Sequence, residues 1–250
     1  MISKSELQAV ISKYNLSGMN NAVKWVTKDN QLTIKFQSPD KNMIGEVIHT
    51  DFDLIDSELA IFDTSKLDKL LAITSGDLNL QLEKVGNIYG KLIIEDVSYK
   101  LKYSIADLLL IKTPQRVNDT NDYIIESVLD SESINAIIKA KNAIQSERNI
   151  VTFTITKNFD GDQVLTMIFG DSDFSNKVEY IVPNTIITNE PGNFSIPFNS
   201  EMIRVICANN RDADTATMSL NLNGMLKFEF SKDNWKSTYY VVRLAKREDQ

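Results

Sequence analysis

The sequence has a single histidine, His49, and a single cysteine, Cys207, among 250 residues. One cysteine cannot form an intrachain disulfide, so nothing in the sequence indicates an oxidising compartment. One histidine without a second histidine or a cysteine partner provides neither a catalytic triad nor a zinc site. The sequence therefore predicts no metal site, no cofactor and no catalytic residues.

Long apolar runs are also missing. No segment has about 18 consecutive apolar residues, and the N-terminal MISKSELQAV lacks the apolar stretch of a signal peptide. Apolar residues make up 42% of the chain and charged residues 24%, which is ordinary for a globular protein. We expect a soluble, cytoplasmic protein with no membrane partner.

The nine glycines are scattered and form no loop that could cradle a phosphate. GDSDF, at 170–174, is similar to the nucleophile block of GDS-type esterases, but the N-terminal position and the downstream Asp-x-x-His of those enzymes are missing. NFDGD, at 158–162, has too few acidic ligands for calcium and fits a hairpin turn better. A hydrolase that uses Ser172 is therefore the weakest interpretation.

Most of the chain alternates apolar and polar residues over short stretches, which predicts strands with one buried face. Turn signals such as KDN (28–30) and NLNG (221–224) separate these stretches, so we expect antiparallel meanders. The clearest predicted strands are 31–37, 78–85, 99–106, 150–157, 225–230 and 237–244.

Four stretches have a helical period instead. Each begins after a residue whose side chain can accept a hydrogen bond from the first turn. The expected ranges are about 3–15, 64–74, 131–146 and 200–208. The expected caps are Ser3, with Glu6 in a capping box, Asp63, Asp130 or Ser131, and Asn199.

The helices form a repeat. The apolar stripe of the first helix recurs in the third after 127 residues, and that of the second recurs in the fourth after 136 residues. The second half therefore holds about nine extra residues between its helices, which we place in the loop 183–192. We predict an N-terminal domain (1–111), a polar connector (112–122) and a C-terminal domain (123–250). The alternative is a chance coincidence of patterns in a two-layer protein. The matching positions are Leu7, Val10 and Ile11 with Ile134, Ile137 and Ile138, and Leu67, Leu70 and Leu71 with Ile203, Ile206 and Cys207.

The charge is unevenly distributed. The chain carries a net charge of −7, yet each helical window (3–15, 64–74, 131–148 and 199–211) has one more basic than acidic side chain. For a single helix, an ordinary solvated face explains this excess. If all four polar faces line one surface, they could contact a phosphate backbone loosely and without reading its sequence.

Two halves that each run helix, strands, helix, strands resemble the sliding DNA clamps. These processivity factors of DNA polymerases are similar to proliferating cell nuclear antigen. The ending STYYVVRLAKRED is similar to the last strand and tail of the eukaryotic and archaeal clamps, with Leu244 and Ala245 at the place of their Leu-Ala motif. The run DFDLIDSELAIFDTSKLDKLLAI (51–73) resembles the T-even type of tailed bacteriophages more closely. The resemblance implies an α+β DNA-clamp fold with two similar domains, each with antiparallel sheets outside and two helices on the inner face.

The resemblance also implies a non-enzymatic homotrimer that encircles duplex DNA without sequence preference. An ATP-dependent clamp loader opens such a ring, and the replicative DNA polymerase docks on it. T-even clamps also support late viral transcription, and a viral chain would act in the host cell cytoplasm. The alternative is a phage structural or adaptor protein built from duplicated β-rich domains.

The residues that would face DNA lie on the four helices. Lys141 falls on an apolar-stripe position. For this residue the alternative to a DNA contact is equally good: its side chain would lie along the edge of the core with only the ammonium group in water. The full set is Lys4, Lys13, Lys66, Lys69, Lys139, Lys141, Arg148, Arg204 and Arg211.

Two further sites follow from the resemblance. Subunits would join through edge strands at 99–106 and 176–183, because unpaired edges seek partners; the alternative is that both strands are sheet interior. The expected interface residues are Tyr99, Leu101, Tyr103, Ile105, Val178, Tyr180 and Val182. A partner peptide would bind beside the connector, although this connector is less hydrophobic than in the family. The expected pocket residues are Val47, Ile111, Pro114, Val117, Val241, Leu244 and Ala245.

Overall fold

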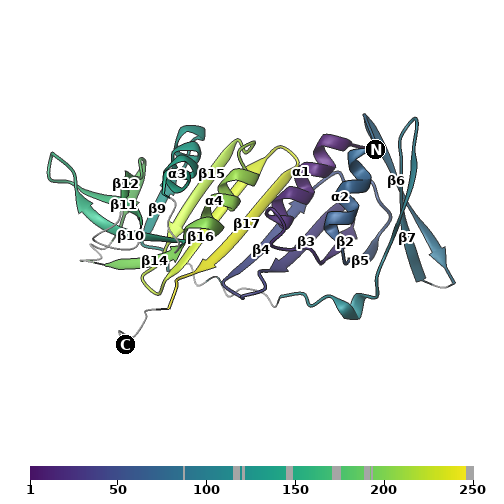
Figure 1. The fold of residues 1–250 in the computed structure, drawn as a ribbon, viewed down its shortest axis with the longest axis horizontal. Helices are drawn as coiled ribbons and strands as arrows, with labels where there is room; N and C mark the ends of the chain where they lie inside the picture. The colour runs from purple at the N-terminus through teal and green to yellow at the C-terminus, as the bar shows by residue number, and fades with distance from the viewer. Residues whose placement is uncertain are drawn as a thin grey trace. The chain divides into compact units, whose positions relative to one another are not determined.

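The computed structural model describes residues 1–86, 88–114, 119, 122–144, 149–170, 176–188, 192 and 194–245. The chain forms two compact units (Figure 1). Unit 1 comprises Met1–Val117 together with Asp233–Ser237, and unit 2 comprises Asn118–Lys232 together with Thr238–Gln250. The division between the units thus falls inside the predicted connector.

Unit 1 contains two helices, α1 (Lys4–Asn15) and α2 (Thr64–Ala72), and two sets of antiparallel strands. One set has the order β4-β3-β2-β5 and the other the order β1-β6-β7-β8. A short 3-10 helix, η1 (Leu108–Leu110), follows β8. The strands are β1 (Ile2–Ser3), β2 (Val23–Lys28), β3 (Gln31–Gln37), β4 (Met43–His49), β5 (Ser57–Ile61), β6 (Asp77–Val85), β7 (Ile88–Glu95) and β8 (Lys100–Ser104).

Unit 2 contains α3 (Ser131–Ala143) and α4 (Ser200–Asn209) with two further sets of strands. One set has the order β12-β11-β10-β14 and the other the order β13-β9-β15-β16-β17. The strands are β9 (Ile125–Val128), β10 (Ile150–Lys157), β11 (Gln163–Phe169), β12 (Val178–Ile181), β13 (Thr185–Ile187), β14 (Ser195–Asn199), β15 (Thr215–Leu220), β16 (Met225–Lys232) and β17 (Trp235–Val242).

The two units repeat one topology, as the helix patterns predict. In unit 2 the order β12-β11-β10-β14 takes the place of β4-β3-β2-β5, and β9-β15-β16-β17 takes the place of β1-β6-β7-β8. The extra element of unit 2 is β13, which pairs with β9 and lies in the segment that we expected to be only a loop. That expectation was wrong for Thr185–Ile187, because the edge of β9 gives this apolar segment a pairing partner.

Each predicted cap begins its helix. The side chains of Ser3, Asp63, Asp130 and Asn199 each accept a hydrogen bond from a backbone N–H in the first helical turn, at 2.7–3.1 Å. Asp130, not Ser131, is therefore the cap of α3. These bonds satisfy donors that a helix leaves free at its N-terminus, which fixes where each helix starts.

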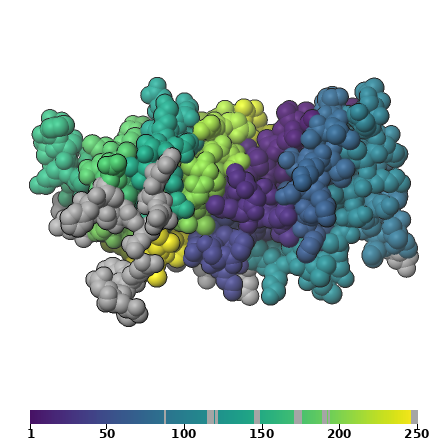
Figure 2. Space-filling model, viewed as in Figure 1, coloured from purple at the N-terminus to yellow at the C-terminus, as the bar shows by residue number. Residues whose placement is uncertain are grey.

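Within each unit the two helices contact each other and lie over one face of the strands (Figure 1). The predicted stripes of Leu7, Val10 and Ile11 in α1 and Ile134, Ile137 and Ile138 in α3 are buried. In unit 1 the Tyr14 and Thr64 hydroxyls are 3.3 Å apart and join α1 to α2. The polar side chains Lys66 and Lys69 of α2 and Lys139 of α3 remain exposed. Figure 2 shows the molecule in the same view with all its atoms.

The segment Asp233–Ser237 belongs to unit 1, although the sequence analysis placed it in the C-terminal domain. The backbone carbonyl of Asn234 accepts a hydrogen bond from the Thr50 N–H at 2.7 Å, and its side-chain amide donates to Glu6. Glu6 also lies 2.9 Å from the buried ring of His49. His49 is thus part of a polar cluster with Glu6 and Asn234 that holds this turn.

Candidate nucleic-acid interface and sheet edges

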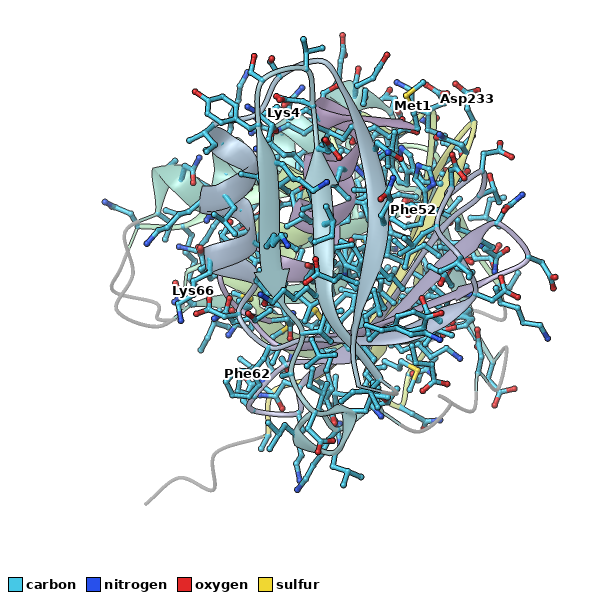
Figure 3. The ribbon with its side chains drawn as sticks, turned by 90° about the vertical axis from the view of Figure 1, so that its right-hand side faces the viewer. Met1, Lys4, Phe52, Phe62, Lys66 and Asp233 are labelled. Carbon is cyan, nitrogen blue, oxygen red and sulfur yellow. The ribbon has the colours of Figure 1, made fainter. Side chains whose placement is uncertain are left out.

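Four of the predicted DNA-facing cations have exposed side chains. Lys66 and Lys69 lie on α2, Lys139 lies on α3, and Arg211 lies in the turn after α4. The Lys66 side chain is 77% exposed, forms an ion pair with Asp63 at 3.1 Å and projects outwards from the helix (Figure 3). Lys69, Lys139 and Arg211 form no ion pair within the part of the chain that the structure describes, so no carboxylate there neutralises their charges.

Lys13 does not occupy the predicted surface. Its side chain is 1% exposed, and its Nζ atom lies 3.8 Å from the centroid of the Trp235 ring. The prediction failed because Lys13 lies next to the apolar stripe of α1, and the indole ring that covers it comes from a distant segment of the sequence. A buried ammonium cannot contact a phosphate.

Lys4 is also engaged within unit 1. Its Nζ atom donates hydrogen bonds to the carbonyl oxygens of Ala72 at 2.9 Å and Thr74 at 2.6 Å. Ala72 is the last residue of α2 and Thr74 follows two residues later, so Lys4 lies at the helix C-terminus, where the helix dipole favours a positive charge. Lys4 therefore caps α2, and the predicted DNA contact would compete with this bond.

In unit 2 an acidic side chain holds two of the predicted cations. Glu201 receives two hydrogen bonds from the guanidinium of Arg204, and its Oε2 atom lies 4.0 Å from the Nζ of Lys141 on α3. The hydrogen bonds from Arg204 lower the pKa of Glu201, with a smaller contribution from the charge of Lys141. Lys141 is 13% exposed, which agrees with the alternative of a side chain at the edge of the core. Arg148 lies outside the described residues.

The predicted interface strand β8 ends the order β1-β6-β7-β8. Its side chains alternate: Leu101 and Tyr103 are buried, whereas Lys100 and Lys102 are exposed. The Tyr103 hydroxyl donates to the carbonyl of Asp63 at 3.1 Å and accepts from the N–H of Asp63 at 3.0 Å. This pair of bonds ties the edge strand to the start of α2. Of the other predicted interface residues here, Tyr99 is exposed and Ile105 is half-buried.

In unit 2 the strand β12 likewise ends the order β12-β11-β10-β14. Val178 and Tyr180 are half-buried, and Glu179 and Ile181 are exposed. Burial raises the pKa of Tyr180, whose hydroxyl lies against Ser133 of α3. Val182, which follows the strand, is 2% exposed and packs in the core of unit 2. The alternative that both strands are sheet interior is wrong for the isolated chain.

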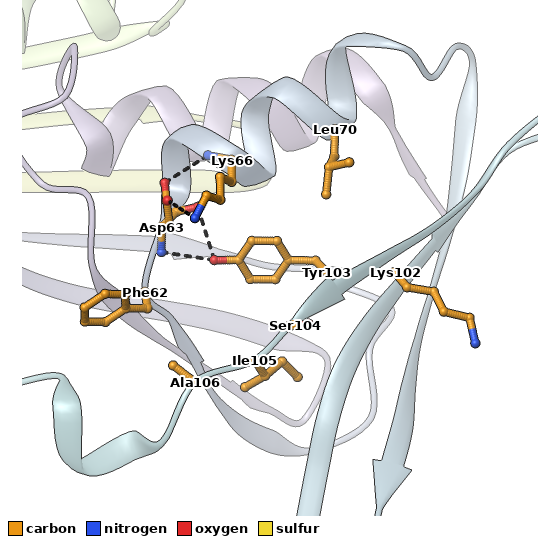
Figure 4. A pocket seen from close by; sticks show the side chains of 9 residues that line it. All are labelled: Phe62, Asp63, Lys66, Leu70, Lys102, Tyr103, Ser104, Ile105 and Ala106. Atoms are coloured by element: carbon orange, nitrogen blue, oxygen red, sulfur yellow. Dashed lines mark hydrogen bonds and ion pairs between the residues drawn. The ribbon is translucent and has the colours of Figure 1, made fainter.

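A pocket of about 460 Å³ lies beside β8 in unit 1 (Figure 4). It opens between the start of α2 and the end of β8, and Phe62 remains 52% exposed at its rim. Of its lining, only Tyr103, Ile105 and Lys66 were predicted to belong to functional sites. The lining residues are Phe62, Asp63, Lys66, Leu70, Lys102, Tyr103, Ser104, Ile105 and Ala106.

The predicted peptide-pocket residues do not form one open surface. Val47, Ile111 and Val241 have exposures of 1%, 6% and 0% because they lie on the inward side of their segments, which corrects the prediction for these three. Pro114 and Leu244 are half-buried and Ala245 is exposed. Val117 lies outside the described residues.

The connector is held at Asp119 by a cluster in unit 2 that the sequence analysis missed. The Lys227 Nζ atom lies 3.0 Å from carboxylate oxygens of both Asp119 and Glu229. The Tyr240 hydroxyl donates to Asp119 at 3.1 Å, and the rings of Tyr123 and Tyr240 lie 5.7 and 5.8 Å from the ammonium. Burial opposes the charge on Lys227, but the hydrogen bonds to both carboxylates raise its pKa overall.

The described residues contain no group of three or more histidine, cysteine, aspartate or glutamate side chains that could hold a metal ion. Across the same described parts of the chain, no helix is both long and apolar enough to span a membrane.

Duplicated units with paired helices over antiparallel strands define the DNA-clamp fold, which this chain has in its PCNA-like form. Among solved structures, it resembles PCNA of A. fulgidus with the C-terminal region of FEN-1 bound, at a TM-score of 0.77 and 17% identity over 99% of this chain and 98% of that one. The chain also resembles PCNA of Entamoeba histolytica, at a TM-score of 0.73 and 16% identity over 97% of this chain and 96% of that one. Its likeness to PCNA of Thermococcus kodakaraensis has a TM-score of 0.73 and 15% identity over 97% of each chain. No protein-family model and no curated protein sequence matches this chain.

Proposed function

We propose that this chain is a ring-shaped DNA sliding clamp that encircles duplex DNA and tethers a replicative polymerase. The observation that carries the proposal is the duplicated clamp topology, which aligns with PCNA over 97–99% of this chain. The protein would act as a non-enzymatic scaffold, without a cofactor.

The mechanism is topological. A closed ring need not bind DNA tightly, because it leaves the duplex only by opening an interface or reaching an end. Exposed cations such as Lys66, Lys69, Lys139 and Arg211 would contact phosphates loosely and allow sliding. A polymerase bound to the ring stays near the primer end at a high effective concentration, as two linked binding modules do.

The ring itself would be a homotrimer joined through β8 of one copy and β12 of the next. Each strand ends its set of strands in the chain, and unpaired edge groups favour pairing with a further strand. The pocket beside β8 would then lie within the interface, where apolar residues such as Phe62 and Leu70 could be covered. The proposed interface residues are Tyr99, Leu101, Tyr103, Ile105, Val178 and Tyr180. Val182 no longer belongs to this set, because it is buried in unit 2.

The finer assignment follows the resemblance of residues 51–73 to the T-even type. We propose a bacteriophage clamp that acts in the host cell cytoplasm, is opened by an ATP-dependent clamp loader and supports late viral transcription. The partner peptide would bind around the exposed or half-buried residues Pro114, Leu244 and Ala245. PCNA of A. fulgidus, whose structure has the C-terminal region of FEN-1 bound, offers the analogy.

Two measurements test this function. Light scattering across a concentration series should approach about 85 kDa, the mass of three chains of 28.3 kDa. Protein threaded onto a linear duplex should then stay bound when both ends carry streptavidin and be lost when the ends are free. Equal retention on duplexes with blocked and with free ends would favour the alternative of a phage structural or adaptor protein. A chain that stays strictly monomeric would favour the same alternative.

A further inference from the structure

We propose that the turn Asp233–Ser237 is a strap that controls a local opening of unit 1. When the strap detaches, α1 and the end of β4 open while unit 2 stays folded. The strap lies between β16 and β17, whose other residues belong to unit 2, and it packs in unit 1. The inference concerns a motion within one chain and does not depend on the proposed ring.

The strap contacts both ends of α1. The side-chain amide of Asn234 donates a hydrogen bond to Glu6 in the first turn of the helix, and the Trp235 ring centroid lies 3.8 Å from the Nζ atom of Lys13 in the last turn. Glu6 and Lys13 are seven residues apart, which places them two turns apart on the same face of the helix. An amide donor thus meets the carboxylate, and the face of an indole ring meets the ammonium.

The strap also holds the end of β4. The backbone carbonyl of Asn234 accepts hydrogen bonds from the N–H of Thr50 at 2.7 Å and from its hydroxyl at 3.1 Å. His49, the last residue of β4, is buried and lies 2.9 Å from Glu6, while its Nδ1 atom has no hydrogen-bond partner among the described residues. Glu6 therefore orients His49, and Asn234 in turn holds Glu6. Loss of the strap would disturb α1 and β4 at the same point.

The burial of Lys13 couples the strap to α1. Its side chain is 1% exposed, and an ammonium in such a position is costly to desolvate unless other groups compensate. The indole ring of Trp235 provides part of this compensation. When the ring leaves, that part is lost, and the ammonium is better solvated with α1 open than with α1 packed. Detachment of the strap therefore favours opening of the helix.

The way the strap is built makes it the segment of unit 1 that detaches first. Both of its ends continue into unit 2, and Asn234 and Glu6 are 228 residues apart in the sequence. Strands β2, β3 and β4, in contrast, are joined by continuous antiparallel ladders. Segments held by few hydrogen bonds open at a lower free energy than such ladders do.

The test uses the full-length chain and hydrogen exchange read by mass spectrometry at one protein concentration. Trp235→Leu removes the indole ring and keeps an apolar side chain, whereas Asn234→Ala removes the amide that donates to Glu6. Phe153→Leu, a buried change on β10 in unit 2, is the matched control for the loss of an aromatic ring. Circular dichroism shows whether each variant folds.

We expect Trp235→Leu to speed the exchange of amides in α1 and β4 at least about tenfold and to leave β10 and β11 unchanged. Asn234→Ala should give the same pattern with an increase of about threefold, and Phe153→Leu should give the reverse pattern.

Three results would overturn the inference. Equal acceleration in both units would mean that the chain opens as one body, and faster exchange in the turn alone would mean that α1 does not depend on the strap. If Trp235→Leu does not fold, Asn234→Ala decides the question, and unchanged exchange of α1 and β4 in that variant would reject the strap.

Discussion

The ammonium nitrogen of Lys13 lies 3.8 Å from the centroid of the Trp235 ring, and both side chains are almost completely buried. A desolvated cation over an indole ring contributes about 2 kcal/mol. Lys13 belongs to α1, whereas Trp235 belongs to the segment Asp233–Ser237 that joins unit 1. The contact therefore stabilises the fold of unit 1 and takes Lys13 away from solvent.

This contact predicts the effect of Lys13→Met. The variant keeps the apolar part of the side chain and removes the charge, so the free energy of unfolding should fall by about 2 kcal/mol. Retention on an end-blocked duplex should not change. Urea unfolding measures the first effect, with Lys28→Met as the control at an exposed site. If Lys13→Met leaves the free energy of unfolding unchanged but reduces retention on the duplex, Lys13 contacts DNA after all.

The accessible helix cations should behave in the opposite way. Lys69 and Lys139 are exposed and form no ion pair within the described residues, so the double variant Lys69→Glu/Lys139→Glu should keep its stability. Threading onto duplex DNA should fall at low salt, and its salt dependence should flatten, because each lost phosphate contact lowers the logarithmic slope by about 0.9.

The control for this pair is Lys28→Glu/Lys41→Glu, which changes the same charge at two exposed sites off the helices. Gel-shift titrations between low and moderate salt compare the two variants with the wild type. Equal losses in both would show that only the net charge matters, and the helix faces would then have no special role.

Much of the fold follows from local sequence signals. The four caps were predicted because a short polar side chain before an apolar periodic stretch satisfies donors of the first turn. β3 and β10 occupy the predicted ranges 31–37 and 150–157, because their alternation matches one buried face. The repeat was predicted because both helix stripes recur in the same order.

The rest depends on contacts between residues far apart in the sequence. Lys13 looks like any surface lysine until Trp235 is placed over it, and β13 becomes a strand because β9 offers an edge. The interior positions of Val47 and Val241 depend on which face of each strand is covered. Charge patterns likewise do not show that Glu201 neutralises Arg204. The sequence predicts where a charged residue lies along its helix, but it does not predict which side chain that residue contacts.

The Glu201 carboxylate predicts a pH dependence. Hydrogen bonds from Arg204 hold its pKa in the folded chain below the ordinary value of 4.5. A carboxyl with a lowered folded pKa stabilises the fold above its unfolded pKa and loses that contribution as the pH falls through the folded pKa. The ion pair is partly exposed, so its contribution at pH 7 should stay below about 1 kcal/mol.

The measurement is the difference in the free energy of unfolding between the wild type and Glu201→Gln. The difference should be present at neutral pH and vanish in the acid range below 4.5. Glu58→Gln, an exposed change on β5, should show no such dependence. A difference that persists unchanged at low pH would mean that packing, not charge, explains the effect.

The cluster around Lys227 predicts that the connector is fixed at Asp119. Removing the ammonium in Lys227→Met leaves two half-buried carboxylates without their shared partner, which should destabilise the chain by about 1–3 kcal/mol. Asp119→Asn should cost less than Lys227→Met, and the two changes should be non-additive because the groups touch. Urea unfolding of both single variants and the double variant measures this coupling. Additive losses would show that the contact contributes nothing.

The burial of Cys207 predicts that its thiol reacts only when the chain unfolds. Cys207 lies on α4 with 0% exposure, and burial raises the pKa of its thiol to about 12. Only the thiolate reacts readily, so the native chain should not react with a disulfide reagent at pH 8, whereas the chain unfolded in urea should react fully. Ser65→Cys adds an exposed thiol on α2 and serves as the positive control, because it should react at once in the folded chain. Rapid labelling of Cys207 in native protein would mean that α4 detaches from the core often, and the packing of unit 2 would need to be reconsidered.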